Sequence, residues 1–210
     1  MRTLVLNVVR LGFAATAIAA MTYQFATLNI DPGFAKGNFF SFFTIQSNIL
    51  SVATLCLLVM VRRDERTPLF DGVRGGVVLY MAITGVVFAL FLSGLQEELD
   101  THIPWVDFVV HRLMPVVLVV DWLIDPPRHR LPLKVAAAWV SYIVAWFVYT
   151  LVRGASVDWY PYPFVDVDRH GYGGVFLNSL FLLAGMVAAA LAFVWIGNRR
   201  VRRSSVAAAA

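Results

Sequence analysis

Long runs of apolar residues, separated by short polar segments, cover almost the whole of this 210-residue chain. Each run is about twenty residues long, which is the helix length needed to cross roughly 30 Å of hydrocarbon. The pattern therefore predicts an all-α, polytopic membrane protein with six transmembrane helices, at residues 4–28, 39–61, 73–95, 106–124, 133–152 and 175–196. It predicts one domain over residues 1–197, followed by a basic tail over residues 198–210 that we expect to be disordered.

The composition agrees with a protein that is embedded in a membrane. Hydrophobic residues make up 60% of the chain and charged residues only 14%, whereas a soluble domain usually carries about a quarter charged residues. The chain has one cysteine, Cys56, so an intrachain disulfide is impossible.

Positive charge is concentrated in alternate loops and in the C-terminal tail, and this predicts that both termini are cytoplasmic. The basic residues of these segments are Arg62, Arg63, Arg66, Arg74, Arg128, Arg130, Lys134, Arg199, Arg200, Arg202 and Arg203. The other loops hold only Lys36, Arg153 and Arg169, among several acidic residues. The net charge of +4 thus follows membrane topology and does not indicate nucleic-acid binding. The first run resembles a signal peptide, but it is long and Arg10 interrupts it, so we expect a retained span.

The second predicted span carries a stripe of polar residues. Ser41, Thr44, Asn48 and Ser51 recur at intervals of three and four, which places them on one face of a helix. Hydroxyl and small residues often mediate helix packing in membranes, so the stripe is either packing surface or part of a site.

The fourth predicted span is unusual because it contains Asp107, His111, Arg112 and Asp121. Ionisable groups are rare in hydrocarbon and usually face a protein interior or a wet cavity. Asp107 lies four residues before His111, on the same face, and can orient its ring. Pro115 removes a helical hydrogen bond beside His111 and predicts a kink. The cluster is therefore a functional site or a buried network that fixes helix packing.

Thr44 and His111 are expected at the same depth. Each lies five residues inside the outer boundary of its span, and the two spans run in the same direction, so both are roughly 7–8 Å deep. If these two helices are neighbours, the hydroxyl and the imidazole can face each other.

The remaining polar features are expected to be structural or solvated. Asp121 and Asp125 should pair with Arg128 and Arg130 at the inner end. The aromatic outer loop over residues 153–174 is either an interfacial belt or a lid over a site. His102, His129 and His170 lie in predicted loops and are expected to be solvated. The sequence has no phosphate-binding glycine motif and no metal-ligand pattern, so we expect neither a metal nor a cofactor.

The stretch from Phe43 to Asn48, followed by His111, Pro115 and Asp121-Trp122, resembles the family of androgen-induced-gene and androgen-dependent TFPI-regulating membrane proteins. The resemblance extends over most of the chain in span pattern, and Gln46, Ser47 and Asn48 look like a bacterial version of the motif. It implies a multi-pass protein of the bacterial inner (plasma) membrane whose partners are the bilayer and a fatty acyl ester. It also implies hydrolysis of fatty acid esters of hydroxy fatty acids, with Thr44 as nucleophile and His111 as the required histidine.

Under this hypothesis His111 is the general base for Thr44. Gln46, Ser47, Asn48, Asp107 and Arg112 are then the residues from which substrate or oxyanion contacts are expected. Two other functions remain open. The protein could be a small transporter or channel that uses Asp107, His111 and Arg112 as a proton or substrate relay, or a binding or assembly protein whose polar core is structural. The sequence leaves the oligomeric state undetermined.

Overall fold

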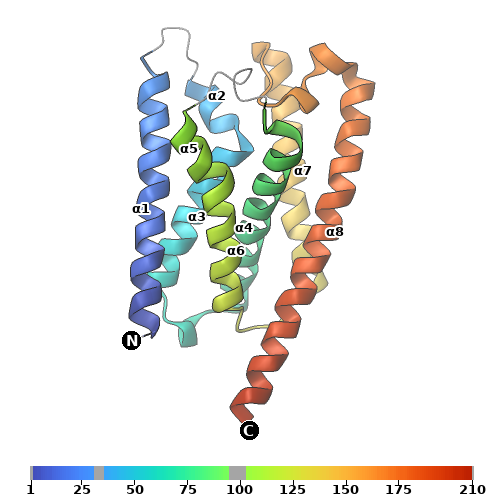
Figure 1. The fold of residues 1–210 in the computed structure, drawn as a ribbon. Helices are drawn as coiled ribbons and strands as arrows, with labels where there is room; N and C mark the ends of the chain where they lie inside the picture. Colours follow the sequence, from blue (N-terminus) through green and yellow to red (C-terminus); the bar gives the residue numbers. More distant parts are fainter. Residues whose placement is uncertain (1, 31–35, 95–102, 210) are drawn as a thin grey trace.

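The computed structural model describes residues 2–30, 36–94 and 103–209, and over these residues the chain is helical, without any strand. The helices stand side by side in one bundle, and α1 begins at the same end at which α8 finishes (Figure 1). The first half consists of α1 (Arg2–Leu28), α2 (Lys36–Ser41), α3 (Phe43–Met60), the 3₁₀ turn η1 (Arg63–Glu65), α4 (Pro68–Val87) and the π-helical η2 (Phe88–Leu92). The second half consists of α5 (Pro104–Phe108), the π-helical η3 (Val109–Leu113), α6 (Met114–Ile124), α7 (Leu133–Val157), the 3₁₀ turn η4 (Pro163–Val165) and α8 (Val167–Ala209).

Five helices are long and apolar enough to cross a membrane: Thr3–Leu28, Phe43–Met60, Pro68–Leu92, Leu133–Val157 and Val167–Val201. The fourth predicted span, 106–124, is helical throughout as α5, η3 and α6, but it carries three charged residues and is not among the five. The all-helical prediction is confirmed over the described residues, and the structure is compatible with an integral, multi-pass membrane protein.

The outward surfaces of α1 and α8 are apolar, as expected for helices that contact lipid. Large contiguous apolar surfaces on a protein exterior mark sites of membrane or protein interaction. Examples of exposed apolar side chains are Leu4, Val8, Leu11, Ile18, Phe176, Leu177, Leu180 and Phe181.

Helix boundaries differ from the predicted ones where local capping residues act. α4 begins five residues before the predicted span because Thr67 accepts a hydrogen bond from the amide of Phe70 at 3.1 Å and Pro68 occupies the first helical position. α8 starts at Val167 and bends at Gly171, whose φ of +65° is accessible mainly to glycine. α8 continues to Ala209, so the predicted boundary at residue 198 does not coincide with the end of a helix.

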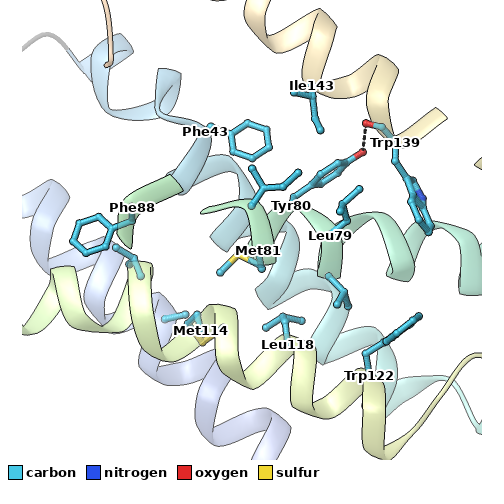
Figure 2. Packing of buried hydrophobic residues seen from close by; sticks show 14 of the residues in the cluster. Phe43, Leu79, Tyr80, Met81, Phe88, Met114, Leu118, Trp122, Trp139 and Ile143 are labelled. Carbon is cyan, nitrogen blue, oxygen red and sulfur yellow. Dashed lines mark hydrogen bonds between the residues drawn. The ribbon is translucent and has the colours of Figure 1, made fainter. Parts of the chain in front are cut away.

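The core of the bundle is formed where α4 packs between α6 and α7 (Figure 2). Trp139 of α7 lies flat against Gly75 and Gly76 of α4, and a Cβ atom at either glycine would lie 2.7 Å from the indole. Trp139 also donates to the carbonyl of Gly72 (2.9 Å), and Tyr80 donates to the carbonyl of Trp139 (3.1 Å). These glycines therefore permit a close approach of two helices.

A buried ion-pair cluster joins α1, α4 and α6 at the end of the bundle where α1 begins. Arg10 contacts Asp121 and Asp125, each at 2.7 Å, and Arg74 contacts Asp121 at 2.8 Å. Arg66 contacts Asp125 at 2.9 Å. The prediction that Asp121 and Asp125 pair with basic residues of the following loop was wrong. The two carboxylates pair instead with Arg10, Arg66 and Arg74, which are distant in sequence.

The loop after α6 is held by a different acid, the fully buried Asp71 of α4. Its carboxylate accepts from the amides of Arg128 (2.9 Å) and His129 (2.8 Å), and it lies 2.9 Å from the ring Nδ1 of His129. His129, which we expected to be solvated, is therefore a structural partner of Asp71. His170 is exposed, as expected, and His102 lies outside the described residues.

Candidate active site

The second predicted span is not one helix but two, and the break lies directly before Thr44. Phe42 has an extended conformation (φ −64°, ψ 127°), so α2 ends at Ser41 and α3 begins at Phe43. Thr44 consequently lies in the first turn of α3, where backbone amides have no intrahelical partner. Ser41 does not share its face, because Ser41 contacts the hydroxyl of Tyr149 on α7 at 2.9 Å.

Tyr162, from the segment between α7 and α8, covers Thr44. Its hydroxyl lies 3.2 Å from Thr44 Oγ1 and accepts from the Thr44 amide at 3.3 Å. The tyrosine is buried and stacks on Phe164, with ring centroids 5.2 Å apart. Burial raises the pKa of Tyr162, so the phenol keeps its proton at neutral pH and can donate to Thr44. Tyr162, from the aromatic segment 153–174, thus covers Thr44.

The fourth predicted span contains a π-helical turn at His111, and this turn connects it to α3. The amide of Met114 bonds to the carbonyl of Val109, five residues back, which leaves the carbonyl of Val110 without its helical partner. Asn48 of α3 donates to this carbonyl at 3.1 Å and to the carbonyl of Thr44 at 2.9 Å. π-Helical turns are frequent at functional sites because they free such groups. The adjacency of the two spans, which the sequence could only assume, is therefore observed.

His111 is held between an acid and an aromatic ring. Its Nδ1 lies 2.9 Å from Asp107 Oδ1, as the spacing of four residues predicts. Phe88 of η2 stacks on the imidazole, with centroids 4.3 Å apart and planes inclined by 13°. An ionised carboxylate can only accept, so in the neutral tautomer that donates from Nδ1 to Asp107 the Nε2 atom carries the free lone pair.

Thr44 and His111 line the same small cavity. Its volume is about 30 Å³, which is enough for roughly one or two water molecules. Asp107, Tyr162 and Gln24 are among the other residues that line it. The hydroxyl, the imidazole and its acid are thus brought to one buried space from different parts of the chain.

His111 also lines a second, much larger space, an open groove of about 600 Å³ between α4 and α6. Its walls are almost entirely apolar, and Phe88, Arg112 and Pro115 are among the residues that form it. Beside the groove, Gly85 allows α4 to pack closely against α6, because a Cβ atom there would lie 2.9 Å from Pro115. His111 and Phe88 therefore line both the apolar groove and the small cavity that contains Thr44.

The structure places the other predicted site residues differently. Gln46 faces α7, where it accepts from the hydroxyl of Tyr142 (2.8 Å). It also donates to the carbonyl of Phe40 on α2 (2.9 Å). Ser47 is fully buried outside the cavity, and its hydroxyl has no hydrogen-bond partner among the described residues. Arg112 is exposed in the groove, 5.5 Å from the centre of the Phe88 ring, and does not join Asp107 and His111 in the small cavity.

Sequence reasoning missed Tyr162, Gln24 and Phe88 as members of the site. Tyr162 was visible only as one member of an aromatic-rich segment. Gln24 was visible as a polar residue within the first apolar run, and it is buried in the cavity wall. Phe88 carries no sequence signal, because its role depends on the stacking of η2 against η3.

Within the described ranges, no three His, Cys, Asp or Glu side chains are grouped so that they could hold a metal ion. No protein-family model, curated protein or solved structure matches this chain.

Proposed function

We propose that this protein is an intramembrane hydrolase of lipid esters in which Thr44 is the nucleophile and His111 the general base. The observation that carries the proposal is that both side chains line one cavity of about 30 Å³. A threonine hydroxyl is a weak nucleophile that requires a nearby base, and the base requires a group that orients it. Asp107, at 2.9 Å from His111, supplies the orienting group.

The proposal includes a membrane orientation. The helical segment 104–124 is a further span, the fourth along the chain, which brings the total to six; its Asp107 and Asp121 are tolerated because they face partners inside the bundle. The basic end of the bundle, at which α1 begins and α8 finishes, faces the cytoplasm. The protein then resides in the bacterial inner (plasma) membrane, and the cavity lies near the outer face.

The reaction proceeds in two balanced steps. His111 takes the proton of the Thr44 hydroxyl while Thr44 Oγ1 attacks the ester carbonyl. The tetrahedral intermediate then expels the alkoxide, which receives the proton from His111, and an acyl-threonine remains. In the second step His111 takes a proton from water, whose oxygen attacks the acyl group. Collapse releases the fatty acid, and His111 returns the proton to Thr44.

Two features next to Thr44 are suited to stabilise the oxyanion. The Tyr162 hydroxyl lies within hydrogen-bond distance of Thr44, and Thr44 itself lies in the first turn of α3, where the helix dipole favours negative charge. Asn48 is less suited, because both of its observed donor contacts are to backbone carbonyls of Thr44 and Val110. Its role is to hold α3 against η3.

The apolar groove suits a long acyl chain as part of the substrate. An alkyl chain enters it from the lipid, and Arg112 at its wall can bind a carboxylate head group. A branched ester between a fatty acid and a hydroxy fatty acid has both an alkyl chain and such a carboxylate. This chemistry agrees with the substrate class implied by the family that the sequence resembles.

Fluorophosphonate labelling of the purified protein, followed by peptide mapping, tests the proposal. We expect a label on Thr44 of the wild type and none in the Thr44→Ala or His111→Ala variants. A Thr150→Ala variant is the matched control, because Thr150 is also a buried membrane threonine but lies outside the cavity. Labelling of wild type and Thr44→Ala to the same extent would show that Thr44 is not the nucleophile.

Transport through a relay of Asp107, His111 and Arg112 is the alternative. The contact between Asp107 and His111 suits proton transfer, but Arg112 lies in the groove and not in the small cavity. A pH-driven flux in liposomes that requires His111 but not Thr44 would favour transport over hydrolysis.

A further inference from the structure

A third pocket, distinct from the small cavity and the apolar groove, lies at the other end of the bundle from the proposed active site. It is formed by α1, the end of α3, η1 and the end of α6. Its volume is about 430 Å³, and it shares no lining residue with the cavity of Thr44 and His111. Its polar wall is formed by four arginines, two aspartates and two neutral side chains: Arg10, Arg62, Arg63, Arg66, Asp64, Asp125, Thr3 and Asn7. The ester hydrolysis proposed above uses none of these residues.

The pocket and the ion pairs behind it carry an excess of positive charge. Among the buried side chains, the three guanidinium groups of Arg10, Arg66 and Arg74 face the two carboxylates of Asp121 and Asp125, which leaves one positive charge uncompensated. The exposed Arg62 and Arg63 add positive charge to the pocket wall, next to the exposed carboxylate of Asp64. Removing unbalanced charge from water is unfavourable unless a counter-charge accompanies it. A bound anion would restore the balance.

Arg66 is one of the two buried arginines in the wall of the pocket. Its side chain is only 3% exposed, and it contacts Asp125 at 2.9 Å. Its Nε has no hydrogen-bond partner within the part of the chain that the structure describes, although Arg66 lines the pocket. A buried donor without an acceptor is unfavourable, so an acceptor oxygen that came within hydrogen-bond distance of Nε would stabilise it.

The remainder of the wall is apolar, and it includes Leu58, Val61 and Ile124. The pocket therefore combines a cationic side with a hydrocarbon side at the end of a transmembrane bundle. Basic pockets between helices at the cytoplasmic side of a membrane are suited to anionic head groups.

We infer that this pocket binds a phosphate group, either in the head group of an anionic phospholipid or as a soluble phosphate. Guanidinium groups recognise phosphate through paired hydrogen bonds, and several arginines from different elements can share its oxygens. Arg10 from α1, Arg66 from the segment before α4 and Arg62 and Arg63 from the segment after α3 provide such a convergent set.

The test compares lipid and soluble phosphate on the purified full-length protein. Native mass spectrometry after exposure to equal amounts of phosphatidylglycerol and phosphatidylcholine measures lipid retention. Thermal unfolding in phosphate and in chloride, at equal ionic strength, measures binding of inorganic phosphate. The informative variant is Arg62→Gln/Arg63→Gln, since these side chains are 76% and 51% exposed and Asp125 keeps its buried partners Arg10 and Arg66 when the 3.5 Å contact of Arg63 is lost. Arg130→Gln is the matched control, because Arg130 is exposed and lies outside the pocket.

We expect selective retention of phosphatidylglycerol, weakened by about fivefold for each guanidinium removed in the double variant and unchanged in Arg130→Gln. Stabilisation by inorganic phosphate that competes with phosphatidylglycerol would also support the site and assign it to soluble phosphate. Equal retention of both lipids together with no effect of phosphate would overturn the inference. An equal loss in Arg130→Gln and in the double variant would overturn it too, since the effect would then come from overall charge.

Discussion

The hydroxyl of Tyr162 lies 3.2 Å from Oγ1 of Thr44, across 118 positions of sequence. The tyrosine comes from the segment between α7 and α8, and the threonine from the first turn of α3. Both residues line the small cavity to which His111 also contributes. Through Tyr162, the segment between α7 and α8 is part of the proposed active site.

Replacing Tyr162 by phenylalanine should lower ester hydrolysis by about ten- to a hundredfold, the effect expected when one aligned hydroxyl donor is lost. The substituted ring would still stack on Phe164, so the fold should be retained. Steady-state hydrolysis of a long-chain ester measures the effect. Tyr172→Phe is the control, because Tyr172 is 65% exposed. Full activity of the Tyr162→Phe variant would remove Tyr162 from the site.

Replacing Asp107 by asparagine should lower turnover by about a hundredfold or more, since the amide cannot reliably hold the proton on Nδ1 of His111. Binding of the ester should change little, because Asp107 contacts His111 rather than the apolar groove. Separate measurement of kcat and KM checks this expectation. An Asp168→Asn variant, on an exposed residue of α8, should behave as wild type. A change confined to KM would contradict the orienting role of Asp107.

The Asp121→Asn variant should be destabilised by about 3–5 kcal/mol, because it leaves the buried guanidinium group of Arg74 without its carboxylate and Arg10 with only one of its two, that of Asp125. Equilibrium unfolding in mixed micelles measures the loss. The double variant Arg10→Met/Asp121→Asn should lose less than the sum of its two single variants, since the groups interact directly. Strict additivity would show that the contact contributes little.

The Gly76→Ala variant should be destabilised by about 1–3 kcal/mol, as expected for overpacking of a core. The new Cβ would lie 2.7 Å from the Trp139 ring, which is held by its own hydrogen bond to Gly72. Gly185→Ala on α8 is the matched control, because no atom lies within 4 Å of its new Cβ. We expect that variant to be as stable as wild type or slightly more stable. Thermal unfolding of both variants side by side distinguishes packing from helix propensity.

The sequence by itself determined that the chain is helical and suited to a membrane, because hydrocarbon imposes a length and a polarity on every run of residues. It also placed Asp107 beside His111, since a separation of four residues is fixed by the helix. Local rules of this kind need no knowledge of neighbouring helices.

Only the tertiary structure decided how these elements meet. The break at Phe42, the π-helical turn that frees the carbonyl of Val110, and the burial of Tyr162 all depend on packing between segments far apart in sequence. The same holds for Asp121 and Asp125, whose partners come from α1 and from the region around the start of α4 rather than from the next loop. A buried charge or hydroxyl pairs with whichever group the fold brings within hydrogen-bond distance, and the spacing of residues along one helix does not determine which group that is.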